Sequence, residues 1–170
     1  MFKIGEFVIY KRDLCKIKSI EKNLTNNLEY YCLSPIEDDS LSIKVPTTNK
    51  FNYLRYPISK KQAEELINSI PSILPLNTND KLLEAEYKAL MKTNHHEDLI
   101  KIIKTTYLRN EFRKNNGKKI GDKDLTYFNQ AERFLYNELS FSLGKGYDEC
   151  KNYIIEKVCY NLKKDNSSND

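Results

Sequence analysis

The sequence predicts an α+β protein, with a small antiparallel β-barrel or sheet module at the amino terminus and an all-α helical bundle at the carboxy terminus. Two patterns along the chain support this prediction. Up to Pro46, apolar and polar residues alternate within short runs, a pattern that is typical of half-buried strands. Beyond Ser59, apolar residues recur every three or four positions, as they do in amphipathic helices.

Four short runs of apolar residues, separated by turn-rich pieces, predict the strands of the β module. They span residues 2–10, 15–20, 28–33 and 41–45. Strands at such short intervals favour an antiparallel meander. Pro46 ends the last strand because proline has no N–H to donate, and the chain over 51–57 is expected to run extended.

A first helix is predicted over 60–70. Ser59 and Gln62 form a capping-box pattern at its start. Pro71 and Pro75 lie beyond its end, where they prevent the helix from continuing and predict a stiff connector.

Four more helices are predicted in the rest of the chain. Their expected starts are Asn79 or Asp80, Asn94 with Glu97, Asp122, and Tyr147. Their expected buried residues are Leu82, Leu83, Tyr87, Leu90 and Met91 in the first, Leu99, Ile102, Ile103, Thr106 and Tyr107 in the second, Leu125, Phe128, Ala131, Leu135, Leu139 and Leu143 in the third, and Cys150, Ile154 and Val158 in the last. Glycines at 117 and 144 are expected to end the middle two helices.

These patterns divide the chain into four segments. We expect a β module over 1–58, a helix and proline-containing connector over 59–77, a helical bundle over 78–163 and a flexible polar tail over 164–170.

Charge and hydropathy exclude several classes of protein. Lys and Arg (28) only slightly outnumber Asp and Glu (24), so the chain lacks the strongly basic character of a dedicated nucleic-acid binder. Its many lysines also fit a compositional bias of the source. No apolar run approaches the roughly 20 residues of a membrane span, and no secretory signal is visible. We therefore expect a cytoplasmic protein with no membrane partner.

Matches to catalytic or metal-binding patterns fail individually. His95 and His96 are adjacent, so they would point to different sides of a helix. The four cysteines lack the spacing of a zinc site, and no Gly-rich phosphate loop is present. We expect no catalytic residue, metal, cofactor or small-molecule substrate, and hence a binding protein rather than an enzyme.

Four segments resemble the amino-terminal module of the CarD-like bacterial transcription regulators, a module that also occurs in transcription-repair coupling factors. They are FKIGEFVIY (2–10), CKIKSIE (15–21), LEYYCL (28–33) and LSIKVP (41–46). The stretches 95–108 and 125–140 resemble the helical carboxy-terminal domain of that family.

The resemblance implies a Tudor-like β module that binds the β subunit of bacterial RNA polymerase. The last strand alternates like an edge strand, and an exposed edge can pair with a strand of a partner. Lys44 lies where the family carries a basic contact residue. The polymerase-binding residues expected on this basis are Lys22, Ser42, Ile43, Lys44 and Pro46. The alternative is that both lysines are ordinary solvated side chains.

The resemblance also implies a helical domain that contacts promoter DNA. Basic residues cluster between the third and fourth predicted helices, where they would make weak contacts to the DNA backbone. They are Arg109, Arg113, Lys114, Lys118, Lys119 and Lys123. The alternative is a solvated basic loop balanced by Glu111, Asp122 and Asp124.

Two functions therefore remain open. The first is a transcription regulator that binds RNA polymerase and weakly contacts promoter DNA. The second is a protein–protein interaction module whose helical domain binds another protein rather than DNA.

Overall fold

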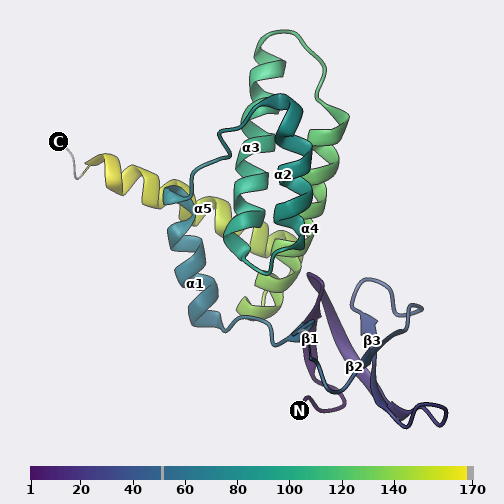
Figure 1. Cartoon of the computed structure of the whole chain (residues 1–170). Coiled ribbons are helices and arrows are strands. Elements are labelled where there is room, and N and C mark those ends of the chain that lie inside the picture. The colour runs from purple at the N-terminus through teal and green to yellow at the C-terminus, as the bar shows by residue number, and fades with distance from the viewer. Residues whose placement is uncertain (51, 168–170) are drawn as a thin grey trace. The chain divides into compact units, whose positions relative to one another are not determined.

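The structure, a computed structural model, describes residues 1–50 and 52–167, with side chains described as far as Leu162. The chain divides into two compact units, Met1–Pro57 and Ile58–Asp170. The first unit holds an antiparallel sheet and the second holds the helices, which confirms the α+β class (Figure 1).

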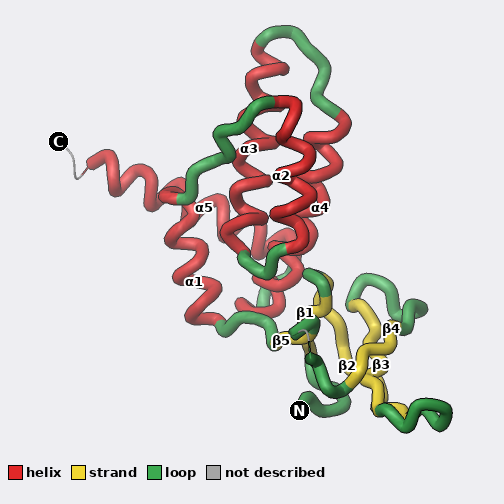
Figure 2. Tube along the Cα trace, in the orientation of Figure 1, coloured by secondary structure: helices red, strands yellow, loops and turns green. Residues whose placement is uncertain are grey.

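The sheet of the first unit has the strand order β4-β3-β2-β1-β5 (Figure 2). Its strands are β1 (Phe7–Tyr10), β2 (Asp13–Lys22), β3 (Glu29–Pro35), β4 (Ile43–Pro46) and β5 (Leu54–Arg55). All four pairings are antiparallel, so the predicted meander is confirmed, with β4 at one edge. The strand β5 lies within the stretch expected to be extended, and it pairs with β1 at the other edge.

The first strand begins later than predicted. The chain turns at Gly5, which has a φ of 88°. This turn prevents residues 2–6 from continuing the strand, and β1 starts only at Phe7. The Phe2 ring instead packs edge-on against the rings of Tyr31 and Tyr56.

One face of the sheet forms a small apolar core. Its buried residues are Val8, Cys15, Ile17, Tyr31, Leu33, Val45 and Leu54. Burial raises the pKa of the Cys15 thiol to about 12, so this cysteine remains a protonated apolar residue at neutral pH. Cys15 and Cys32 are both free thiols.

The described part of the second unit contains five α-helices and one short 3-10 helix. They are α1 (Lys60–Ser69), the 3-10 helix η1 (Ile70–Ser72), α2 (Asp80–Lys92), α3 (His96–Asn115), α4 (Asp122–Leu143) and α5 (Tyr147–Ser167). The helices α2, α3 and α4 run side by side, while α1 packs against α5 and α4 (Figure 1). One core joins all five helices. Its largest fully buried side chains include Ile67, Tyr87, Leu99, Ile102, Leu135 and Leu139.

Most helix ends agree with the sequence prediction. The capping box of Ser59 and Gln62 is present, and Asn79 caps α2 through a bond from Lys81 N. Gly144 ends α4 with a φ of 65°. Asn94 was the wrong choice for the start of α3, because the helix begins one residue later, after His95.

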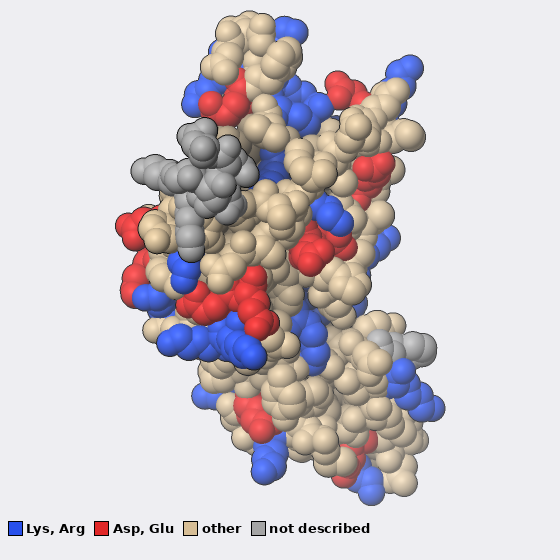
Figure 3. Space-filling view, turned by 90° about the vertical axis from the view of Figure 1, so that its left-hand side faces the viewer, with Lys and Arg blue, Asp and Glu red and all other residues tan. Residues whose placement is uncertain are grey.

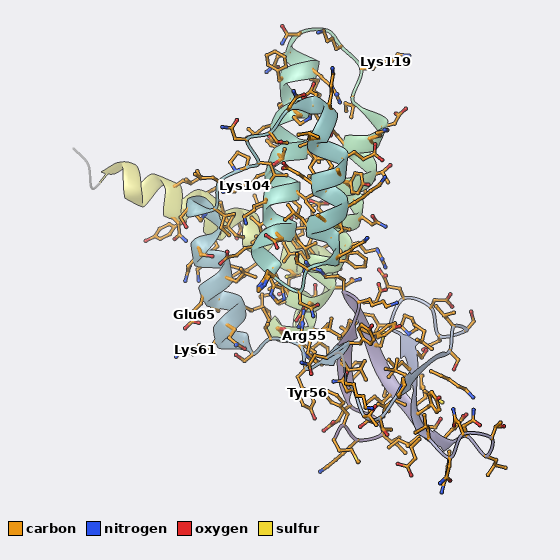
Figure 4. The ribbon with its side chains drawn as sticks, in the orientation of Figure 1. Arg55, Tyr56, Lys61, Glu65, Lys104 and Lys119 are labelled. Carbon is orange, nitrogen blue, oxygen red and sulfur yellow. The ribbon has the colours of Figure 1, made fainter. Side chains whose placement is uncertain are left out.

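The segment 59–77, expected to hold a helix and a proline-containing connector, contributes to the core of the helical unit. Ala63, Ile67 and Ile73 are buried in that core. The ammonium group of Lys104 on α3 donates to the carbonyl oxygens of Ile70 and Ile73, the second at 2.6 Å (Figure 4). Because Lys104 donates to carbonyl groups at the start of η1 and just past its end, the segment is held against α3 rather than acting as a spacer.

Three apolar residues that were expected inside are exposed, namely Leu82, Tyr107 and Leu125. Of their neighbours, Leu83 and Thr106 are buried as predicted, whereas the burial of Asp124 in place of Leu125 was not predicted. Successive residues of a helix point about 100° apart, so each of these three lies outside the buried stripe of its helix.

The last helix extends into the predicted tail. It reaches Ser167, so residues 164–167 are helical. Residues 168–170 lie outside the described part of the chain. Phe51, in the stretch expected to be extended, also lies outside it. Of the helices described, none is long and apolar enough to cross a membrane.

Candidate functional site

The strand β4 offers its main chain at the edge of the sheet. Thr47 N donates to Glu29 O at 2.9 Å, and Val45 pairs with Tyr31 in the same register. Hydrogen-bonded and non-hydrogen-bonded pairs alternate along an antiparallel ladder. Lys44 lies between two hydrogen-bonded positions, so its N–H and C=O point away from β3 and toward the open edge.

The side chains of β4 alternate between the core and the solvent. Val45 is 3% exposed and Ile43 packs partly against the core, whereas Lys44 and Pro46 are exposed, as is Ser42 just before the strand. A partner strand that paired with this edge would therefore meet exposed side chains on one face only.

Lys44 and Lys22 lie around one shallow hollow. It has a volume of about 280 Å³ and is lined by Glu21, Lys22, Asn23, Tyr30 and Lys44. Lys44 donates to Glu21 Oε2 at 2.7 Å, a bond that raises the pKa of Lys44 and lowers that of Glu21. Both side chains are more than half exposed, so the ion pair contributes little stability and is easily exchanged for a partner's carboxylate.

The basic cluster of the helical unit is organised around one buried carboxylate, that of Asp124. This residue is 4% exposed, and its Oδ2 accepts from Arg109 Nε at 3.1 Å and from Arg113 Nη1 at 2.8 Å. Tyr87 donates to Oδ1 at 3.3 Å, and Arg109 also donates to Asp80 at 2.6 Å. These bonds join α2, α3 and α4, so Arg109 and Arg113 have a structural role.

The ionisation of these groups follows from their surroundings. Burial opposes the charge of Arg109, but the bonds to Asp80 and Asp124 outweigh it and raise its pKa. Burial, together with the charge of Asp124, raises the pKa of the Tyr87 hydroxyl above its ordinary value. Arg109 therefore stays charged and the Tyr87 hydroxyl stays protonated at neutral pH.

Gly121 makes room for Arg113. A Cβ atom added at this position would lie 1.7 Å from Arg113 Nη1, so the guanidinium group lies directly against the glycine. Gly121 N also donates to Asn110 Oδ1 at 3.3 Å. Sequence reasoning missed Gly121 and the central role of Asp124, although an aspartate three residues past a glycine at a helix start was visible.

Two other residues of the basic cluster also have acidic partners. Lys123 forms an ion pair with Glu84, and Lys114 lies 3.6 Å from Glu111. Lys118 and Lys119 lie on the loop between α3 and α4, where Figure 4 labels Lys119, and among the described residues neither has a carboxylate within ion-pair distance. On the face seen in Figure 3, acidic and basic side chains are interspersed. Four of the six basic residues of the predicted cluster, Arg109, Arg113, Lys114 and Lys123, thus have acidic partners.

Two hollows flank the Arg109 and Arg113 side chains. One has a volume of about 560 Å³ and is lined mainly by charged residues of α2, α3 and α4. The other, of about 530 Å³, is lined by Asp80, Leu108, Arg109, Phe112, Arg113 and Lys118. The second hollow combines apolar and basic side chains.

The side chain of His96 has a structural partner within the helical unit. Its Nε2 lies 2.8 Å from Glu138 Oε2, and Glu138 Oε1 accepts from Ile58 N at 3.0 Å. Within the described residues, no three histidine, cysteine or acidic side chains are grouped to hold a metal ion. His96 therefore fastens α3 to α4.

Comparison with known proteins assigns no family to this chain. No family model matches this chain, and none of the curated proteins matches it.

Proposed function

We propose that this protein is a cytoplasmic transcription regulator. It binds the β subunit of bacterial RNA polymerase through a Tudor-like β module, and its helical bundle contacts promoter DNA weakly. The observation that carries the proposal is the edge strand β4, whose outward main-chain groups at Lys44 are open to a partner strand. The resemblance of residues 2–46 to CarD-like regulators is the reason for proposing polymerase as the partner.

Binding at this edge uses two kinds of contact. Main-chain bonds between β4 and a strand of the partner supply affinity that depends little on sequence. The ammonium groups of Lys22 and Lys44, which lie around one hollow, favour a partner strand that carries carboxylates.

The DNA contact rests on the loop between α3 and α4. Lys118 and Lys119 are exposed there and are the members of the cluster best placed to neutralise phosphates. Two such contacts are weak in isolation. Once the β module is bound to polymerase, however, the high effective concentration of nearby DNA compensates for the low affinity.

The proposal is tested by binding of the purified chain to the polymerase β subunit, measured by calorimetry. Lys44→Pro removes the outward N–H and leaves the bonds to β3 intact, so we expect at least a tenfold loss of affinity. Lys44→Ala, the matched control, keeps the N–H and should lose less.

Two results would count against the proposal. Equal affinity of Lys44→Pro and the wild-type protein would exclude pairing at this edge. A wild-type protein that does not bind the β subunit would exclude polymerase as the partner.

The second candidate function is a protein–protein interaction module whose helical unit binds protein. It is favoured by the pairing of Arg109, Arg113, Lys114 and Lys123 with carboxylates. The double variant Lys118→Glu, Lys119→Glu separates the two candidates. It abolishes DNA binding under the first and leaves partner binding intact under the second.

A further inference from the structure

The 530 Å³ hollow on α3 exposes two large apolar side chains. Phe112 is 65% exposed and Leu108 is 53% exposed. They are four residues apart and therefore share one side of the helix. The volume falls within the range of about 300–1,000 Å³ that is usual for ligand sites. Exposed apolar side chains grouped in a hollow indicate a binding surface.

The end of α3 holds the basic rim of this hollow in place. Gly117 has a φ of 66°, its N–H donates to Lys114 O at 3.1 Å, and Lys118 N donates to Arg113 O at 2.8 Å. This pair of bonds is the Schellman motif. It fixes the main chain of Lys118 beside Arg113, so both cations face the same hollow.

The charge around the hollow suits an anion. Residues 104–123 contain seven basic and two acidic residues. Asp124 accepts from only one nitrogen of Arg113, Nη1. A guanidinium group has further N–H donors, which can bind an anion in the hollow. Asp80 partly offsets this charge, but its side chain is 77% exposed and its partner is Arg109 rather than Lys118.

The shapes of the lining groups favour a nucleobase over an apolar peptide side chain. A phenyl ring and two guanidinium groups are planar, and planar groups stack on bases. We propose that Phe112 is a stacking platform for an unpaired base of single-stranded DNA, while Arg113 and Lys118 hold the neighbouring phosphates. This inference rests on the proposed DNA contact and names its substrate as a single strand.

The test compares single-stranded and duplex DNA. The full chain is titrated into fluorescein-labelled 20-nucleotide oligo-dT and into a 20-base-pair duplex at 50 mM salt, with anisotropy as the readout. We expect Phe112→Ala to weaken single-strand binding by about 5- to 150-fold, the usual effect of losing one base stack, and to leave duplex binding unchanged. Tyr160→Ala, which removes an aromatic ring of similar exposure from α5, should change neither.

A second variant separates stacking from phosphate contact. The double change Lys118→Gln, Lys119→Gln should weaken binding of both DNA forms and reduce the salt dependence of single-strand binding by about 0.7 per lost phosphate contact. Phe112→Ala should leave that salt dependence unchanged. Circular dichroism of each variant confirms that the helices are retained.

Three outcomes would overturn the inference. The first is a Phe112→Ala variant that binds oligo-dT as well as the wild type. The second is a wild-type chain that binds neither DNA form, which leaves a protein segment as the occupant. The third is tighter binding of oligo-rU than of oligo-dT, which identifies RNA as the ligand. None of these outcomes affects binding of β4 to polymerase, which is measured separately.

Discussion

Asp124 shows how one buried charge organises its neighbours. A carboxylate that is 4% exposed is unfavourable unless it is paired and hydrogen-bonded. Arg109, Arg113 and Tyr87 all donate to it, and they come from two helices, α3 and α2. The arginines of the predicted DNA-binding cluster therefore also stabilise the helical unit.

The fit of Arg113 against Gly121 leads to a prediction at the scale of one residue. Gly121→Ala places a Cβ where Nη1 lies, so the guanidinium group must leave Asp124. We expect the free energy of unfolding to fall by about 1–3 kcal/mol, the usual cost of losing a partner of a buried polar group. Urea denaturation measures this change.

Gly146→Ala is the matched control for Gly121→Ala. Gly146 also directly precedes a helix, and a Cβ there meets nothing within 4 Å. Its loss of stability should therefore report only the replacement of glycine at a helix start. Equal losses in the two variants would show that the contact with Arg113 contributes no stability.

The helix α3 connects several parts of the second unit. It packs against α2 and α4, and its Lys104 holds the segment after α1. At its start, Asp98 accepts from Thr93 at 2.8 Å and from Lys101 at 3.0 Å. At its end, the turn around Gly117 positions Lys118. Residues that lie close to each end of α3 in the sequence therefore fix both ends of the helix.

The start of α3 gives a prediction about pH. Burial acts to raise the pKa of Asp98, but the bonds from Lys101 and Thr93 outweigh it, so the pKa lies below its ordinary value. The ionised form therefore stabilises the fold above the unfolded pKa of about 3.9, and this stability is lost as the pH falls through the folded pKa. Asp98→Asn should cost about 1–2 kcal/mol at pH 7 and progressively less below pH of about 4.

Urea denaturation of Asp98→Asn across this pH range measures the effect. Glu97→Gln serves as the control, because Glu97 is exposed in the same turn and should change stability by less than about 0.5 kcal/mol. A loss in Asp98→Asn that stays constant down to pH 3 would contradict a role for the ionised carboxylate.

The whole molecule consists of two units that have separate apolar cores. The sheet core is small, as expected for about 57 residues, and the helical core is larger. Separate cores suit a protein that is proposed to bind polymerase with one unit and DNA with the other, because each surface can form without the other.

This division predicts that residues 58–170 fold alone. Their core contains residues from all five helices, so the isolated segment should keep its helical circular dichroism and unfold cooperatively. Its binding to oligo-dT should match that of the full chain, while binding to the polymerase β subunit should be lost. A segment that remains unfolded would show that the helical core depends on the β module.

The amino-acid sequence by itself determined the α+β class, the order of the elements and most helix ends. Periodicity and capping are properties of residues within a few positions of one another, such as Ser59 and Gln62 or Gly144 at the end of α4. The edge position of β4 also followed from its alternation and its final proline.

Only the tertiary structure decided the partners of the charged side chains. Arg109 meets Asp124 across 15 positions and Asp80 across 29, while Lys123 meets Glu84 across 39. No local pattern encodes such pairs, because they depend on how α2, α3 and α4 pack together. The same packing makes Arg109 and Arg113 structural and leaves Phe112 exposed beside Lys118.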